Sequence, residues 1–141
     1  MQQLLTFVSH NLMLFGALAV ILALLAHNLF GGSLRGYKTT TPAEAIQLIN
    51  HEDALVLDVR EDGEYRNGHI LNALHIPQNH LQDRLDELEK HKDRAIIVSC
   101  RSGSRSAQAC ALLKKQGFDP VYNLSGGVMA WQSANLPLVK S

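Results

Sequence analysis

Apolar side chains are distributed in two different ways along this chain, before and after residue 36. Residues 12–26, LMLFGALAVILALLA, form an unbroken apolar run, whereas from residue 37 onwards short apolar runs alternate with polar or amphipathic stretches. Fifteen residues span only about 22 Å as a helix, and the hydrocarbon core of a bilayer is about 30 Å thick. Uncharged residues flank the run, so a helix from about residue 4 to residue 28 is long enough to cross a membrane.

Two other interpretations of this segment are weaker. A cleaved signal peptide needs basic residues before its apolar run and a small-residue cleavage site after it, and neither MQQ nor LLAHNLFGGS supplies them. A buried core helix does not fit, because the segment is apolar on every face and the rest of the chain is too small to enclose it. We therefore predict a transmembrane anchor in residues 1–30, a linker in residues 31–38 and a globular domain in residues 39–141.

The flanking charges predict the orientation of this anchor. No Lys or Arg precedes the apolar run, whereas Arg35 and Lys38 follow it. Because basic residues favour the cytoplasmic side of a membrane, the C-terminal domain is expected in the cytoplasm.

The C-terminal part reads as an alternation of strands and helices. Thr41, Pro42 and Glu44 have the spacing of a capping box with proline at the first helical position, so a helix is predicted to begin there. Strands are predicted at residues 54–59, 73–77, 95–99 and 120–124, and further helices at residues 80–92, 104–116 and 128–134. This order predicts an α/β fold with a parallel sheet covered by helices on both faces and a site at the carboxyl ends of the strands.

Composition reduces the number of function classes that the chain could belong to. The chain has 141 residues with 13 basic and 13 acidic side chains, a balance that gives no reason to expect a nucleic-acid partner. Its two cysteines, Cys100 and Cys110, are too few for a disulfide framework, and we interpret both as reduced thiols. The histidines show no metal-ligand spacing, so no metal site is predicted.

The segment AIIVSCRSGSRSA, residues 95–107, places a cysteine where a predicted strand ends and a Ser/Gly/Arg loop begins. A catalytic cysteine reacts as the thiolate, and three features here would stabilise that anion: the N-terminus of the following helix, the amides of the loop, and the charges of Arg101 and Arg105. The alternative is an inert buried cysteine, which is common after a strand. Asp58 and Arg60 are expected at the same edge of the sheet, where they support the loop or form a purely structural ion pair.

Four stretches in order carry a resemblance to a known family. They are YKTTTPAEAIQLI, LVLDVREDGEYRNGHILNALHIP, IIVSCRSGSRSAQACALLKKQGF and VYNLSGGVMAW. From about residue 37 to residue 136 the chain resembles a rhodanese domain, the fold of the sulfurtransferases. With its N-terminal helix it is similar to the membrane-anchored single-domain rhodanese-like proteins of bacteria, which implies a single-pass protein of the cell membrane.

The resemblance implies a specific site. Cys100 would carry sulfur as a persulfide, taking it from a donor such as thiosulfate and passing it to a thiol or to cyanide. The loop residues Arg101, Ser102, Gly103, Ser104 and Arg105 would cradle the persulfide and the donor. Asp58 and Arg60 would support the loop, GHI (68–70) and GG…AW (126–131) would be fold markers, and no cofactor is implied.

Two competing functions stay open. Cysteine phosphatases and arsenate reductases of related fold place an arginine after five residues, whereas here Arg105 follows Cys100 after four, a shorter loop that suits a sulfur-sized substrate. The second alternative is a non-catalytic or weakly catalytic module that docks on a membrane protein, since sulfur chemistry alone does not explain an anchor.

Overall fold

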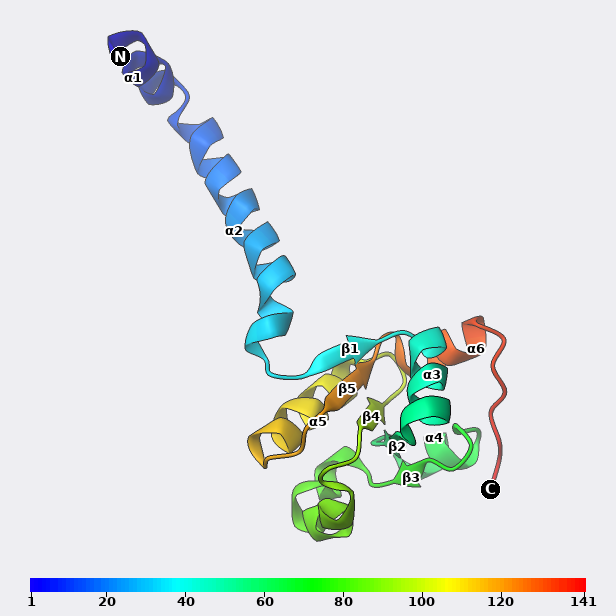
Figure 1. Cartoon of the computed structure of the whole chain (residues 1–141). Coiled ribbons are helices and arrows are strands. Elements are labelled where there is room, and N and C mark those ends of the chain that lie inside the picture. Colours follow the sequence, from blue (N-terminus) through cyan, green and yellow to red (C-terminus); the bar gives the residue numbers. More distant parts are fainter. The chain divides into compact units, whose positions relative to one another are not determined.

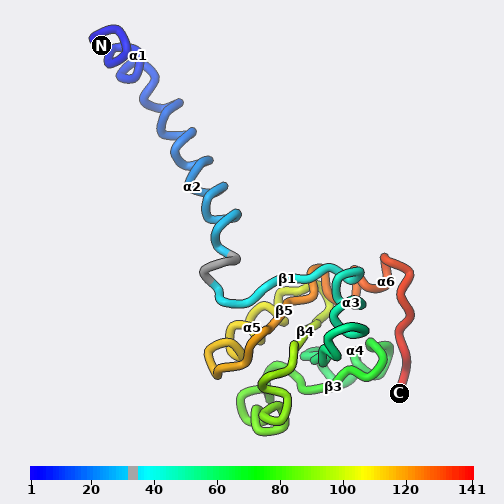
Figure 2. Tube along the Cα trace, viewed as in Figure 1, coloured from blue at the N-terminus to red at the C-terminus, as the bar shows by residue number. Residues whose placement is uncertain are grey.

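The computed structural model describes the backbone of residues 1–141 and the side chains of residues 1–31 and 35–141 (Figure 2). The side chains of residues 32–34, within the predicted linker 31–38, lie outside the described part. The chain divides into two compact units, Met1–Arg35 and Gly36–Ser141.

The N-terminal unit consists of two helices, α1 (Gln2–His10) and α2 (Leu12–Leu34). The single helix predicted from residue 4 to residue 28 is therefore wrong in its continuity. Asn11 separates the two helices with φ −122° and ψ 28°, and its side-chain amide donates to the carbonyl of Phe7 at 2.8 Å. Asparagine competes for backbone hydrogen bonds in this way, which explains a break that hydropathy alone does not show.

The apolar side chains of α2 face outward. A stretch of 20 residues, Leu12–Gly31, is long and apolar enough to cross a bilayer. Its large side chains are exposed, among them Leu14, Ile21 and Leu24 at 60–68%. The length and composition of α2 thus agree with a membrane-spanning segment, which covers residues 12–31 and not the predicted residues 4–28.

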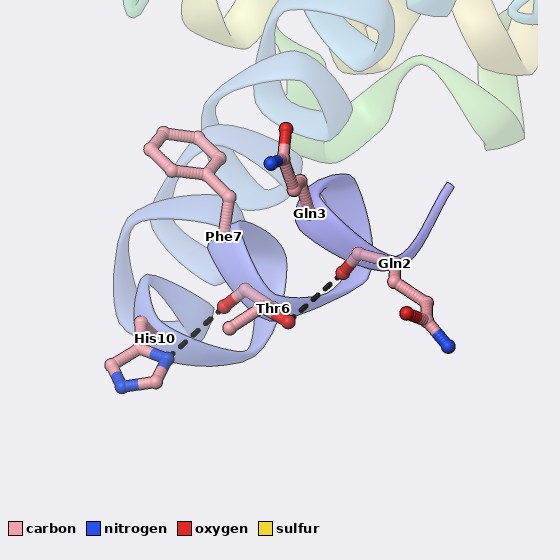
Figure 3. A pocket seen from close by; sticks show the side chains of 5 residues that line it. All are labelled: Gln2, Gln3, Thr6, Phe7 and His10. Atoms are coloured by element: carbon pink, nitrogen blue, oxygen red, sulfur yellow. Dashed lines mark hydrogen bonds between the residues drawn. The ribbon is translucent and has the colours of Figure 1, made fainter.

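The side chains of Thr6 and His10 bond within helix α1. Figure 3 shows a hollow on this helix lined by Gln2, Gln3, Thr6, Phe7 and His10. There the Thr6 hydroxyl donates to the carbonyl of Gln2 at 2.9 Å, and His10 Nδ1 lies 3.1 Å from the carbonyl of Thr6. The hollow therefore contains polar groups that already have partners.

The C-terminal unit is built on a five-stranded sheet (Figure 1). The strands are β1 (Lys38–Thr40), β2 (Leu55–Asp58), β3 (Leu74–His75), β4 (Ile96–Ser99) and β5 (Val121–Leu124). All pair in parallel in the order β1-β5-β4-β2-β3. The predicted strands are confirmed, and β1 is an additional edge strand that the three polar residues KTT did not indicate.

Helices cover both faces of this sheet. On one face α3 (Pro42–Glu52) and α6 (Gly127–Ser133) pack through Ala45 and Trp131 against Val56 and Ile97. The opposite face carries α5 (Ser104–Lys115) and the segment η2 (Gln82–His91), and the residues buried there are Leu57, Leu81, Leu88, Ile96, Val98, Leu113 and Phe118. The two cores confirm the predicted three-layer α/β domain with a parallel sheet.

The start of α3 follows from its sequence. The Thr41 hydroxyl accepts from the amide of Glu44 at 3.3 Å, and the Glu44 carboxylate accepts from the amide of Thr41 at 3.0 Å. These reciprocal bonds satisfy two amide groups that a helix leaves unpaired, so the predicted capping box is confirmed.

Two elements differ from the expectation. The predicted α-helix at residues 80–92 is instead a pair of 3₁₀ segments, η1 (Gln78–His80) and η2, with non-helical angles at Arg84, although its leucines do face the core. A short helix, α4 (Asp62–Arg66), lies in a stretch for which the sequence predicted neither a helix nor a strand. Its capping box joins Glu61 and Glu64, but five polar residues leave no periodic signal.

Candidate active site around Cys100

Cys100 lies where three elements meet. It directly follows β4, and the register pairs Ser99 of β4 with Asp58 at the end of β2. Cys100 and Asp58 therefore both lie at the carboxyl ends of the parallel strands, as predicted. Cys100 is fully buried, and α5 begins four residues later at Ser104. The sulfur therefore lies beneath the N-terminus of a 12-residue helix, whose dipole favours negative charge there.

Two hydrogen bonds reach the sulfur. The amide of Gly103 donates to Cys100 Sγ at 3.0 Å, and the hydroxyl of Ser106 lies 3.3 Å from it. Gly103 has φ +106°, a conformation in which only glycine is unstrained, and this turn aims its amide back at the sulfur.

These contacts set the direction of the Cys100 pKa. Burial alone would raise the pKa of the thiol, but the hydrogen bonds that the Ser106 hydroxyl and the amides of Ser106, Gly103 and Ser102 can give to the thiolate outweigh it. The net effect lowers the pKa of Cys100 below its ordinary value. The loop therefore favours the thiolate, the reactive form of a cysteine.

Ser106 and Asn123 complete the site, and sequence reasoning missed both. The Ser106 hydroxyl donates to Asn123 Oδ1 at 2.5 Å, and Asn123 Nδ2 donates to the carbonyl of Gly103 at 3.1 Å. Asn123 belongs to β5, the neighbour of β4, so it reaches the loop across the sheet. One feature of the sequence could have indicated Asn123: it is the penultimate residue of the predicted strand 120–124, and the carboxyl end of that strand was expected at the same side of the sheet as Cys100.

The start of α6 holds the other side of the loop. The amides of Val128 and Met129 donate to the carbonyls of Cys100 and Arg101 at 2.8 and 3.1 Å. A Cβ atom on Gly127 would lie 2.4 Å from the carbonyl oxygen of Cys100, so only glycine allows this approach. Because the loop carbonyls point to α6, the loop amides are free to face the sulfur.

Arg105 does not bond to the sulfur. Its guanidinium forms a two-pronged ion pair with Glu64 of α4, with both N···O distances 2.8 Å. The Arg105 hydrogen bond, opposed in part by burial, lowers the pKa of Glu64 to about 2, and the same bond raises the pKa of Arg105. The other predicted loop residues, Arg101, Ser102 and Ser104, are exposed.

Asp58 and Arg60 form a buried pair at the end of β2. Arg60 Nη2 lies 2.7 Å from Asp58 Oδ2 and also donates to the carbonyl of Gly68 at 2.7 Å. The pair thereby fixes both ends of the segment that contains α4, and α4 in turn holds Arg105 through Glu64. His69, also in GHI, contacts the carbonyl of Tyr65 at 2.8 Å through Nδ1 and serves the same segment.

Cys110 is separate from this chemistry. It is fully buried in the apolar core on the α5 face, and burial, with the nearby Cys100, raises its pKa far above the usual range. Such a thiol stays protonated and inert. Among the residues that the structure describes, no group of three or more His, Cys, Asp or Glu side chains is placed to hold a metal ion.

Known proteins share this fold. The sequence pattern of the Rhodanese-like domain matches residues 41–134, and the chain therefore belongs to the rhodanese-like family. It is 37% identical to the uncharacterized protein YibN of Escherichia coli (strain K12), covering 99% of both chains, and 43% identical to a sulfurtransferase of Allochromatium vinosum, over 66% of this chain and 85% of that one.

A solved structure shows the same fold. The rhodanese-related protein of Thermoplasma volcanium superposes with a TM-score of 0.67 at 32% identity, over 74% of this chain and all of that one. The family and its relatives support a sulfurtransferase-like enzyme, which acts in general between a sulfur donor and a thiol acceptor.

Proposed function

We propose that this protein is a membrane-anchored sulfurtransferase that carries sulfane sulfur as a persulfide on Cys100. The observation that carries the proposal is the environment of the sulfur, which accepts the Gly103 amide at 3.0 Å and lies 3.3 Å from the Ser106 hydroxyl beneath the start of α5. These groups stabilise an anion at one point, either a thiolate or the terminal sulfur of a persulfide.

The reaction has two balanced steps. The Cys100 thiolate attacks the outer sulfur of a donor such as thiosulfate, forming one S–S bond and breaking another, so that sulfite leaves with the bonding electron pair. An acceptor thiolate or cyanide then attacks the outer sulfur of the persulfide and regenerates the Cys100 thiolate. The two steps together need no external oxidant or reductant.

The two arginines of the loop differ in how much positive charge they can present to an anionic sulfur donor. Arg105 is neutralised by Glu64, whereas Arg101 is exposed at the mouth of the loop. We expect Arg101 and the exposed Ser102 and Ser104 to meet the oxygens of the donor. Arg105 would hold the loop in position.

The N-terminal unit would serve as the anchor. The 20 residues Leu12–Gly31 match the thickness of a bilayer. Just before this span, the side chains of Thr6, Ser9 and Asn11 bond to carbonyls of their own segment, which lowers the cost of placing them close to hydrocarbon. Arg35 and Lys38 follow this span, so the rhodanese domain would lie in the cytoplasm of a bacterial cell.

The test of catalysis uses the full-length chain in detergent. Incubated with thiosulfate and cyanide, the wild type should form thiocyanate, and mass spectrometry after thiosulfate alone should find one added sulfur atom on Cys100. Cys100→Ser should abolish both signals, while Cys110→Ala should keep them. Absence of the adduct in the folded wild type would reject the enzyme and leave the docking module, and hydrolysis of a phosphate ester instead would support a phosphatase.

The test of anchoring uses a C-terminal epitope tag in a bacterial host. Carbonate washing should leave the protein in the membrane pellet, and protease added to spheroplasts should spare the tag until the cells are lysed. A tag that is digested in intact spheroplasts would contradict the cytoplasmic placement.

A further inference from the structure

The direction of the Asn123 carboxamide is fixed by its two neighbours. One side of this group lies 3.1 Å from the carbonyl oxygen of Gly103, which can only accept a hydrogen bond. The nitrogen of Asn123 must therefore face Gly103, and Oδ1 must face Ser106. Since Oδ1 also only accepts, the bond of 2.5 Å between Ser106 and Asn123 must use the hydrogen of the Ser106 hydroxyl.

This arrangement decides which atom donates at the sulfur. A serine hydroxyl has one hydrogen, and that of Ser106 is committed to Asn123. Toward Cys100 Sγ, at 3.3 Å, the hydroxyl therefore presents a lone pair. Only a protonated sulfur complements a lone pair, so the chain of bonds runs from the Cys100 S–H to Ser106 and from Ser106 to Asn123.

We propose that Asn123 is a positioning residue that holds the Ser106 hydrogen away from Cys100 and so keeps the resting cysteine as a thiol. When the thiolate or persulfide anion forms, the hydroxyl turns its hydrogen to the sulfur and releases Oδ1. The loop amides and Asn123 thus act in opposite directions on the same sulfur. Ser106 and Asn123 are buried, so water does not readily substitute for either partner.

The proposal rests on the proposed function only in taking Cys100 as the reacting thiol. Its test measures the proton on that thiol and needs no sulfur transfer, so the two can fail separately. Arg105, with its partner Glu64, and Cys110 act on the charge of Cys100. Arg101 is the next residue in the chain, and the buried pair of Asp58 and Arg60 lies at the same end of the sheet. Every variant keeps all of these groups.

The experiment is a pH titration of Cys100 alkylation in the full-length chain, with iodoacetamide as the probe and mass spectrometry to separate Cys100 from Cys110. Asn123→Leu removes the acceptor with little change of volume, and the midpoint should fall by about half to one pH unit because Ser106 is then free to donate. Ser106→Ala should move the midpoint the opposite way by a similar amount, since the sulfur loses its side-chain donor.

The double variant separates positioning from support of the loop. If Asn123 acts through Ser106, Asn123→Leu should have no further effect on the midpoint once Ser106 is alanine. Ser99→Ala is the matched control, because it removes another buried hydroxyl one residue from Cys100 that has no hydrogen-bond partner, and its midpoint should stay at the wild-type value. A midpoint that rises or stays constant in Asn123→Leu, or that falls equally in the Ser106→Ala background, would overturn the proposal.

Two further measurements guard against a misfolded variant. Asn123→Ala, checked by circular dichroism, should shift the midpoint in the same direction as Asn123→Leu. In the unmodified chain, the side-chain amide NMR signals of Asn123 should titrate with the midpoint of Cys100, because ionisation removes the hydrogen from Oδ1. Signals that stay fixed through that midpoint would contradict the proposal without any substitution.

Discussion

Gly127 shows how a single residue places the whole cysteine loop. It has φ +58°, and a Cβ atom there would lie 2.4 Å from the Cys100 carbonyl and 2.6 Å from that of Arg101. The neighbouring amides of Val128 and Met129 can bond to those two carbonyls only because nothing intervenes. The absent side chain is thus a condition for the position of these two carbonyls at the start of the loop.

We predict that Gly127→Ala reduces sulfur transfer at least about tenfold and lowers the free energy of unfolding by about 2 kcal/mol. The positive φ costs an alanine about 1 kcal/mol, and displacement of the loop carbonyls adds to it. Thiocyanate formation and urea unfolding of the full-length chain measure the two effects.

Gly63→Ala is the matched control for this substitution. Gly63 lies inside α4, has no atom within 4 Å of its would-be Cβ, and is in a helix that alanine favours. Equal losses in the two variants would show that the loop does not depend on the close approach at Gly127.

The sequence predicted residues whose roles are local and missed those whose roles depend on the fold. Cys100 and Gly103 lie in one short loop before a helix, a pattern that can be recognised along the chain. Asn123 acts only because β5 lies next to β4, a pairing that the sequence does not specify. The sequence predicted the charge of Arg105 beside the sulfur but not its ion pair, because the partner Glu64 is 41 residues away in the chain.

At the scale of elements, α4 and α5 are joined by the ion pair of Glu64 and Arg105. Both side chains are about one third exposed, and both oxygens of the carboxylate are bonded. The folded protein holds the pKa of Glu64 at about 2, below its ordinary 4.5. The pair therefore contributes its full stability above about pH 4.5 and loses it as the pH falls toward 2.

We predict that Glu64→Gln destabilises the protein by about 1 kcal/mol at pH 7, a figure reduced for solvent screening. The difference from the wild type should shrink as the pH falls below 4.5 and vanish only below about 2, where the wild-type carboxyl is neutral as well. Urea unfolding of the domain at a series of pH values measures this. Glu87→Gln, which breaks an exposed pair with Arg84, should change stability little, and a constant Glu64→Gln deficit down to pH 2 would contradict the electrostatic origin.

Elements were predictable where burial left a clear pattern. The strands β2 and β4 are buried at every position, and their unbroken apolar runs could be read directly. Leu81, which precedes the 3₁₀ segment η2, and Leu85 and Leu88 within it pack against the core. This spacing is shared with an α-helix, so the helix type could not be distinguished. Two elements carry too few apolar residues to signal themselves, β1 with three residues and α4 with five.

At the scale of the molecule, the residues of the candidate site all lie in the rhodanese-like domain. Both apolar cores, the cysteine loop and the residues that position it lie within Gly36–Ser141. Within this unit the chain enters at the amino end of β1, and Cys100 lies at the opposite, carboxyl edge of the same parallel sheet. Within this domain, Cys100 and the start of β1 therefore lie at opposite ends of the parallel strands.

We predict that a fragment beginning at Gly36 folds alone and transfers sulfur within about twofold of the full-length rate. The reason is that Tyr37, 8% exposed, packs into the core, so this boundary keeps the core complete. A fragment beginning at Thr41 is the matched control: it loses Tyr37 and β1 and should be less stable by about 2 kcal/mol or more, since an aromatic core residue is removed. Only the full-length chain should float with lipid vesicles. If the Gly36 fragment keeps its circular dichroism spectrum yet forms no thiocyanate, the N-terminal unit would take part in catalysis and not only in anchoring.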